Sequence, residues 1–155
     1  ELIEENVIFL ITGNAIEIFG KYIENEDESK IEALGIFDIY AKRDMLHRHN
    51  SIFIGKWESI DIVGFKSQFT FAYGNNEENY FAKVEKGIGL NKESKLEGIM
   101  KNNFIGTYLI GPILILNPLF TEKLLEKMGV NKENLAYAED VKAAYNQRLE
   151  EFKRL

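Results

Sequence analysis

The 155-residue sequence contains no cysteine. This absence excludes disulfides, thiolate metal sites and every mechanism in which a cysteine of this chain acts as the nucleophile. An excess of basic residues is missing as well, because 19 lysines and arginines stand against 25 aspartates and glutamates, for a formal net charge of −6. The lysines are spread along the chain and form no basic stripe. We therefore do not expect this protein to bind nucleic acid.

Long hydrophobic runs are also missing. The longest apolar stretch, residues 107–120, is interrupted by two prolines, a glycine and an asparagine and is too short to cross a bilayer. No signal peptide is recognisable at the start of the sequence. We expect a cytoplasmic protein without membrane association.

The composition that is present is typical of a globular protein, with 45% hydrophobic and 28% charged residues. The length fits one domain, residues 1–155. The sequence begins with what looks like the last turn of a helix leading into a strand. Since a central strand of a parallel sheet needs neighbours on both sides, we expect preceding βα units to be missing from this chain.

The N-terminal segment predicts a strand that turns sharply into a helix. Residues 7–11 form an apolar run rich in β-branched residues, which favours a strand buried on both faces. Thr12, Gly13 and Asn14 interrupt that run. Such a turn is a frequent position for a nucleophile, because the backbone N–H groups at the helix start favour negative charge. Thr12 could serve, but no base that would activate it is recognisable, so packing or a turn hydrogen bond is the alternative.

From Ala15 the spacing of apolar residues becomes helical, and we expect Asn14 to be the N-cap of this helix. The expected apolar face holds Ala15, Ile16, Phe19, Tyr22 and Ile23. The expected solvent face holds Glu17, Lys21 and Glu24.

The middle of the chain is expected to be mostly sheet. The β-rich segments are residues 36–41, 51–55, 60–65, 69–73, 80–84, 95–100 and 104–109. We expect 80–84 to pair with 69–73, and 95–100 to pair with 104–109.

Two helices are predicted for the C-terminal part. One begins at Pro118 with Asn117 as its cap and ends at Gly129, and Asn131 can start the next. Residues 135–155 show an amphipathic pattern, which favours packing on a sheet face over binding to a partner.

Metal and cofactor sites are weakly supported. His47 and His49 are the only histidines and alternate on an extended segment, but two ligands do not make a site and basic neighbours would oppose a cation. Gly87 and Gly89 lack the third glycine and the helix of a dinucleotide fingerprint. We expect neither a metal nor a cofactor.

Several segments together resemble the CobB/CobQ-like branch of class I glutamine amidotransferases, including its GatD-type subunits. The most specific match is the run Gly-Thr-Tyr-Leu-Ile-Gly-Pro at residues 106–112, where the family has histidine in place of the isoleucine, and Asn117 and Pro118 follow as in the family. Further matches are Gly20 at the end of the family's Cys-Gly-Gly-Tyr-Gln-Leu-Leu-Gly, Gly64 and Phe65 of its Gly-Phe-Glu-Asn-His, the glycines and asparagine at 87, 89 and 91, and Glu97 with Gly98.

The resemblance implies an α/β fold that is doubly wound and flavodoxin-like. Aligned on Gly20, the family's catalytic cysteine falls on Gly13 and its catalytic histidine falls on Ile110, so both groups are replaced. Lys66, Ser67 and Gln68 replace the family's Glu-Asn-His. The implied pocket contains Thr12, Gly13, Asn14, Gly64, Phe65, Lys66, Tyr108 and Ile110.

Without thiol and base, only the oxyanion-binding backbone N–H of Asn14 would remain of the family's glutaminase chemistry. The resemblance thus implies a catalytically degenerate subunit that binds a Mur-ligase-like synthetase, or one in a cobyric-acid-synthase-like complex whose thiol another chain supplies. In a simpler alternative, Gly13 has no role beyond permitting a tight turn, and Ile110 has no role beyond filling a gap in the core. A third possibility is altered chemistry or ligand binding in the same pocket, involving Thr12, Lys66 or Tyr108.

Overall fold

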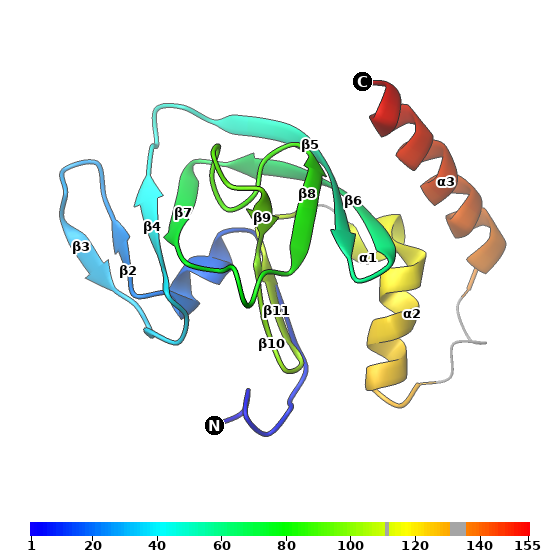
Figure 1. The fold of residues 1–155 in the computed structure, drawn as a ribbon, viewed down its shortest axis with the longest axis horizontal. Helices are drawn as coiled ribbons and strands as arrows, with labels where there is room; N and C mark the ends of the chain where they lie inside the picture. The colour runs from blue at the N-terminus through cyan, green and yellow to red at the C-terminus, as the bar shows by residue number, and fades with distance from the viewer. Residues whose placement is uncertain (111, 131–135) are drawn as a thin grey trace.

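A computed structural model describes residues 1–110, 112–130 and 136–155 (Figure 1). The strands are β1 (Phe9–Thr12), β2 (Tyr22–Glu24), β3 (Lys30–Glu32), β4 (Ile39–Arg43), β5 (His49–Trp57), β6 (Ile60–Gln68), β7 (Thr70–Gly74), β8 (Ala82–Lys86), β9 (Leu96–Glu97), β10 (Ile99–Lys101) and β11 (Phe104–Thr107). The helices are the 3₁₀ helix η1 (Gly13–Phe19) and the α-helices α1 (Ile113–Leu116), α2 (Pro118–Lys127) and α3 (Ala138–Arg154). The expected α/β class and the strand-rich middle are confirmed.

The strands form three sheets, with the orders β1-β11-β10, β3-β2-β4-β7 and β6-β5-β8-β9. β1 runs parallel to β11 and β2 runs parallel to β4, whereas the other pairs between described strands are antiparallel. Figure 1 shows α1, α2 and α3 together on one side of the molecule, next to β6. None of the described helices is both long and apolar enough to span a membrane.

β1 confirms the strand expected at the N-terminus, but the expected burial on both faces is wrong. Phe9, Leu10 and Ile11 are half-buried and Thr12 is exposed. The reason is the position of β1 at the edge of its sheet, where β11 is its one paired neighbour among the described residues.

The helix expected to follow is much shorter than predicted. η1 ends at Phe19, and Tyr22 and Ile23 lie in β2 instead of on a helix face. The chain is extended at Gly20, where a Cβ atom would lie 2.6 Å from the Ile39 carbonyl oxygen of β4. This close approach draws the segment into a sheet and overrides the helical spacing.

Asn14 is also not the N-cap. That position belongs to Thr12, and no side-chain cap hydrogen bond is formed there. Asn14 is an exposed residue within η1.

The pairing expected between residues 69–73 and 80–84 is wrong. β7 pairs with β4, and β8 pairs with β5 and β9. Gly74 explains the first pairing, because a Cβ atom there would lie 2.2 Å from the Asp38 carbonyl oxygen just before β4. The expected pairing of residues 95–100 with 104–109 is confirmed in part, because residues 99–101 pair with 104–106, whereas Leu96 and Glu97 form β9 and pair with β8.

The C-terminal helices follow the predictions closely. α2 begins with Pro118 as its first residue, and Gly129 adopts a φ of +74° directly after the helix. The expected start at Asn131 lies outside the described residues. α3 buries Tyr145 and Leu149 against Ile54 and Val63 of the β5–β6 hairpin, which confirms that its apolar face packs on a sheet.

Candidate functional site

The fold brings Gly13 and Ile110 together. β1 and β11 are parallel and in register from Phe9↔Phe104 to Thr12↔Thr107, so residues after both strands emerge at the same edge of the sheet. Gly13 follows β1 directly, and Ile110 lies three residues after β11. A Cβ atom on Gly13 would lie 3.2 Å from Ile110 Cγ2. The two positions implied by the resemblance are therefore neighbours across a gap of 97 residues in the sequence.

Gly13 also has an unusual backbone conformation, with a φ of +63°. Side chains of L-residues rarely adopt this region, but a nucleophile on a sharp strand-to-helix turn is held in a strained conformation. Glycine occupies the turn without that strain.

β6 forms the border of this site. The Ile110 backbone N–H donates a hydrogen bond of 3.0 Å to the Phe65 carbonyl oxygen, and the two residues form an isolated antiparallel bridge. At Gly64, a Cβ atom would lie 3.1 Å from the Leu109 side chain. Phe65 thus lies beside Ile110, and Gly64 lies beside the preceding residue, Leu109.

Thr12 and Asn14 are both exposed. Thr12 lines a shallow hollow of about 450 Å³ together with Leu10 and residues 112–115, so its lining is mainly apolar.

Lys66 lies in the interior, away from this hollow. Its side chain is 0% exposed and forms an ion pair with the equally buried Glu97. Lys66 Nζ also donates a hydrogen bond of 2.6 Å to the Gly89 carbonyl oxygen. Burial lowers the pKa of Lys66, and the Glu97 carboxylate opposes this shift.

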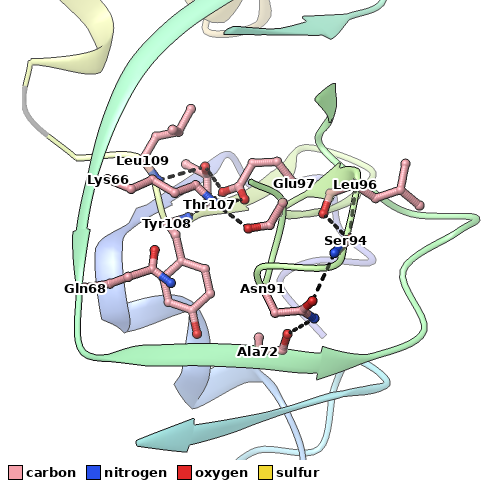
Figure 2. Close-up of polar contacts among 12 residues, drawn as sticks. Lys66, Gln68, Ala72, Asn91, Ser94, Leu96, Glu97, Thr107, Tyr108 and Leu109 are labelled. Atoms are coloured by element: carbon pink, nitrogen blue, oxygen red, sulfur yellow. Dashed lines mark hydrogen bonds and ion pairs between the residues drawn. The ribbon is translucent and has the colours of Figure 1, made fainter. Parts of the chain in front are cut away.

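Glu97 fixes the end of β11 through its other oxygen. Glu97 Oε1 accepts hydrogen bonds from Thr107 Oγ1 at 2.7 Å and from the Tyr108 backbone N–H at 2.8 Å, as Figure 2 shows. Thr107 Oγ1 in turn accepts a hydrogen bond of 3.1 Å from the Leu109 backbone N–H. The Lys66–Glu97 pair therefore holds the backbone that leads to Ile110.

Tyr108 is buried as well, and its hydroxyl donates a hydrogen bond of 3.3 Å to Glu17 Oε1. Burial raises the pKa of Glu17 to about 7. Glu17 was expected on the solvent face of a helix, and this expectation is wrong, because its exposed fraction is only 4%. No local pattern predicts that Glu97 pairs with Lys66 or that Glu17 accepts from Tyr108, since these partners are 31 and 91 positions away in the chain.

The two histidines do not point to a metal site. His47 Nδ1 lies 2.7 Å from Asp44 Oδ1 in an exposed turn, and the His49 ring packs edge-on against Phe71. Among the described residues, no three potential His, Cys, Asp or Glu ligands gather.

Two curated proteins match this chain over most of its length. The GatD subunit of lipid II isoglutaminyl synthase (glutamine-hydrolyzing) from Staphylococcus aureus is 35% identical over 127 residues, which are 82% of this chain and 51% of GatD. The protein of the same name from Streptococcus pneumoniae is 29% identical over 148 residues, or 88% of this chain and 55% of that protein. This chain is similar to GatD. It spans about half the length of these curated GatD relatives. No family model matches the sequence.

Proposed function

We propose that this chain is part of a GatD-type glutamine amidotransferase-like domain that has lost glutaminase activity and acts by binding a synthetase partner. In this proposal the domain belongs to the CobB/CobQ-like branch of class I, and residues outside the chain complete a doubly wound, flavodoxin-like fold. The partner is a Mur-ligase-like synthetase in peptidoglycan amidation.

The observation that carries the proposal is the contact between positions 13 and 110. A cysteine at a sharp strand-to-helix turn and a histidine within reach would form a nucleophile and its base. This chain has a glycine with a φ of +63° at the first position, and the isoleucine that follows β11 fills the space beside it. Neither side chain can attack an amide or accept a proton near neutral pH.

The test rebuilds the pair in the complete protein. In Gly13→Cys/Ile110→His, the histidine should lower the pKa of the thiol and speed its labelling by an electrophilic glutamine analogue at pH 7. The single variant Gly13→Cys is the matched control, because it has the thiol without the base. Equal labelling of the two variants, measured by intact mass, would count against the proposed pairing.

The proposed partner is tested by binding. The names of both relatives describe them as subunits of a synthase, which supports a role within a complex. We expect the complete protein and the Mur-ligase-like synthetase of the same organism to elute together in size-exclusion chromatography. Separate elution, or elution with a cobyric-acid synthetase instead, would contradict the peptidoglycan assignment.

Ligand binding in the same pocket is a second candidate, favoured by the exposed Thr12 in the apolar hollow. Lys66 and Tyr108, in contrast, are fully buried and hydrogen-bonded. A small-molecule screen by thermal shift should then find a ligand whose effect is lost in Thr12→Ala. Ligands that stabilise Thr12→Ala equally would contradict binding at this place.

A further inference from the structure

Glu17 lies on the inner side of a short helix whose outer side faces solvent. η1 has seven residues, and Asn14, Ala15 and Ile18 are exposed on it. Ile16 is 0% and Glu17 is 4% exposed, and the Phe19 ring packs edge-on against the buried Phe104, so these three side chains attach the helix to the rest of the molecule. One of these three attachments is an ionisable carboxyl group.

The surroundings of this carboxyl group offer hydroxyls but no ion pair. Tyr108, just after β11, donates its hydroxyl to Glu17 Oε1 at 3.3 Å, and the Thr70 hydroxyl of β7 faces the same carboxyl. Arg43 of β4 is the basic group whose charge acts on it, but its guanidinium donates a hydrogen bond of 2.8 Å to Asn25. Within the described ranges, no basic nitrogen forms an ion pair with Glu17. A carboxylate buried in this way lacks an ion pair, which would offset most of the free energy lost when its charge is removed from water.

The protonation states follow from these contacts. Burial raises the pKa of Glu17 to about 7. Burial, together with the charges of Glu17 and Glu97, raises the pKa of Tyr108 well above its ordinary value. Tyr108 therefore stays a donor over the whole neutral range, and the group that changes charge is Glu17.

The carbonyl groups of η1 hold the loop that follows β3. The backbone N–H of Leu34 donates to the Ile18 carbonyl at 2.9 Å, and those of Ile36 and Phe37 donate to the Phe19 carbonyl at 3.1 and 3.0 Å. These three amides lose their acceptors when η1 moves away. They are natural reporters of its position.

We propose that ionisation of Glu17 releases η1 from its position between β7 and the end of β11, so that this segment opens as the pH rises toward neutrality. In the closed state the neutral carboxyl accepts the Tyr108 hydroxyl in a dry site. In the open state water solvates the carboxylate, which removes the cost of burying the charge. Because η1 starts at Gly13, the opening changes the surface beside the 13–110 contact, and it does not depend on which partner binds there.

Hydrogen exchange of the complete protein at pH 5.5 and pH 8.0 tests whether η1 opens when Glu17 ionises. Opening that shifts the Glu17 pKa from about 7 to its ordinary value of 4.5 should lower the protection of the Leu34, Ile36 and Phe37 amides roughly 30-fold, after correction for intrinsic exchange. The amides of the β5–β6 hairpin should keep their protection. A fall shared by that hairpin would indicate global unfolding and overturn the proposal.

Two variants separate Glu17 from other carboxyl groups. Glu17→Gln keeps the size of the side chain and cannot ionise, so the protection of the three amides should no longer fall with pH. Glu32→Gln, at an exposed position of β3, is the matched control and should retain the wild-type fall. A fall that persists in Glu17→Gln, or wild-type protection that does not change with pH, would overturn the proposal.

Discussion

Two constraints act on Gly13 at once. Its φ of +63° disfavours any side chain, and a Cβ atom would lie 3.2 Å from Ile110 Cγ2. Gly35 has the same φ of +63°, but nothing lies within 4 Å of its Cβ position. The two glycines therefore separate the cost of the backbone conformation from the cost of the contact.

We expect Gly13→Ala to lower the free energy of unfolding by about 2–4 kcal/mol, and Gly35→Ala by about 1–2 kcal/mol. The difference arises from the crowding against Ile110, so it should shrink when both glycine variants are made with Ile110→Ala. Urea unfolding of the complete protein measures all of these values. Equal costs for the two glycines would show that residues 13 and 110 are not packed together.

The buried pair of Lys66 and Glu97 makes a second prediction possible. Lys66→Met leaves the Glu97 carboxylate buried without its cation and should cost about 3–5 kcal/mol. Glu97→Gln keeps an oxygen that can accept from Thr107 and Tyr108, so the double variant Lys66→Met/Glu97→Gln should recover most of that loss. A double-mutant cycle measured by urea unfolding gives the coupling free energy between Lys66 and Glu97. A double variant whose loss of stability equals the sum of the two single losses would contradict the pairing.

At the scale of the elements, Asn117 connects the helical part to the sheet. It occupies the cap position of α2, but its fully buried side chain does not cap the helix. Asn117 Oδ1 accepts from the Val63 backbone N–H at 2.8 Å, and Nδ2 donates to the carbonyls of Val63 and Ile113, each at 2.8 Å. One side chain thus joins the middle of β6 to the start of α1.

Asn117→Ala should therefore destabilise the protein by about 2–4 kcal/mol, because buried backbone groups lose their partners. Asn50→Ala, at an exposed position of β5, is the control and should change stability by less than about 0.5 kcal/mol. Thermal unfolding followed by circular dichroism compares them. A small effect of Asn117→Ala would mean that the helices are attached by apolar packing alone.

The elements also show what the sequence allows one to predict. α2 and α3 were predictable because Pro118, Gly129 and the amphipathic spacing act locally. The end of η1 was not predictable, because it depends on the approach of Gly20 to β4. The pairing of β7 with β4 was not predictable either, since strand pairing is decided by contacts between distant segments.

The site, too, has one part that the sequence predicted and another that depends on contacts between distant residues. The glycine and isoleucine at positions 13 and 110 were identified from the resemblance, and the parallel pairing of β1 with β11 brings them together. The bonds from Lys66 to Glu97 and from Tyr108 to Glu17 join residues 31 and 91 positions apart. No short motif encodes such pairs, so sequence reasoning placed Lys66 in an open pocket and Glu17 on the surface.

At the scale of the whole molecule, the 13–110 contact lies at one edge of the sheet that contains β1 and β11. α1 lines the hollow beside Thr12, and α2 and α3 lie next to it in Figure 1. The described residues that line this hollow, which are Leu10, Thr12 and residues 112–115, are mainly apolar and include no histidine or cysteine. The central claim of the proposed function is that this surface serves binding and not glutamine hydrolysis.

Release of ammonia from glutamine tests this claim most directly. The complete protein, alone and with its synthetase partner, is incubated with glutamine labelled with ¹⁵N at the side-chain amide, and labelled ammonium is followed by NMR. The synthase that contains Staphylococcus aureus GatD serves as the positive control. The account predicts no more ammonium than in buffer, whereas release at a rate comparable to that of the control synthase would contradict it.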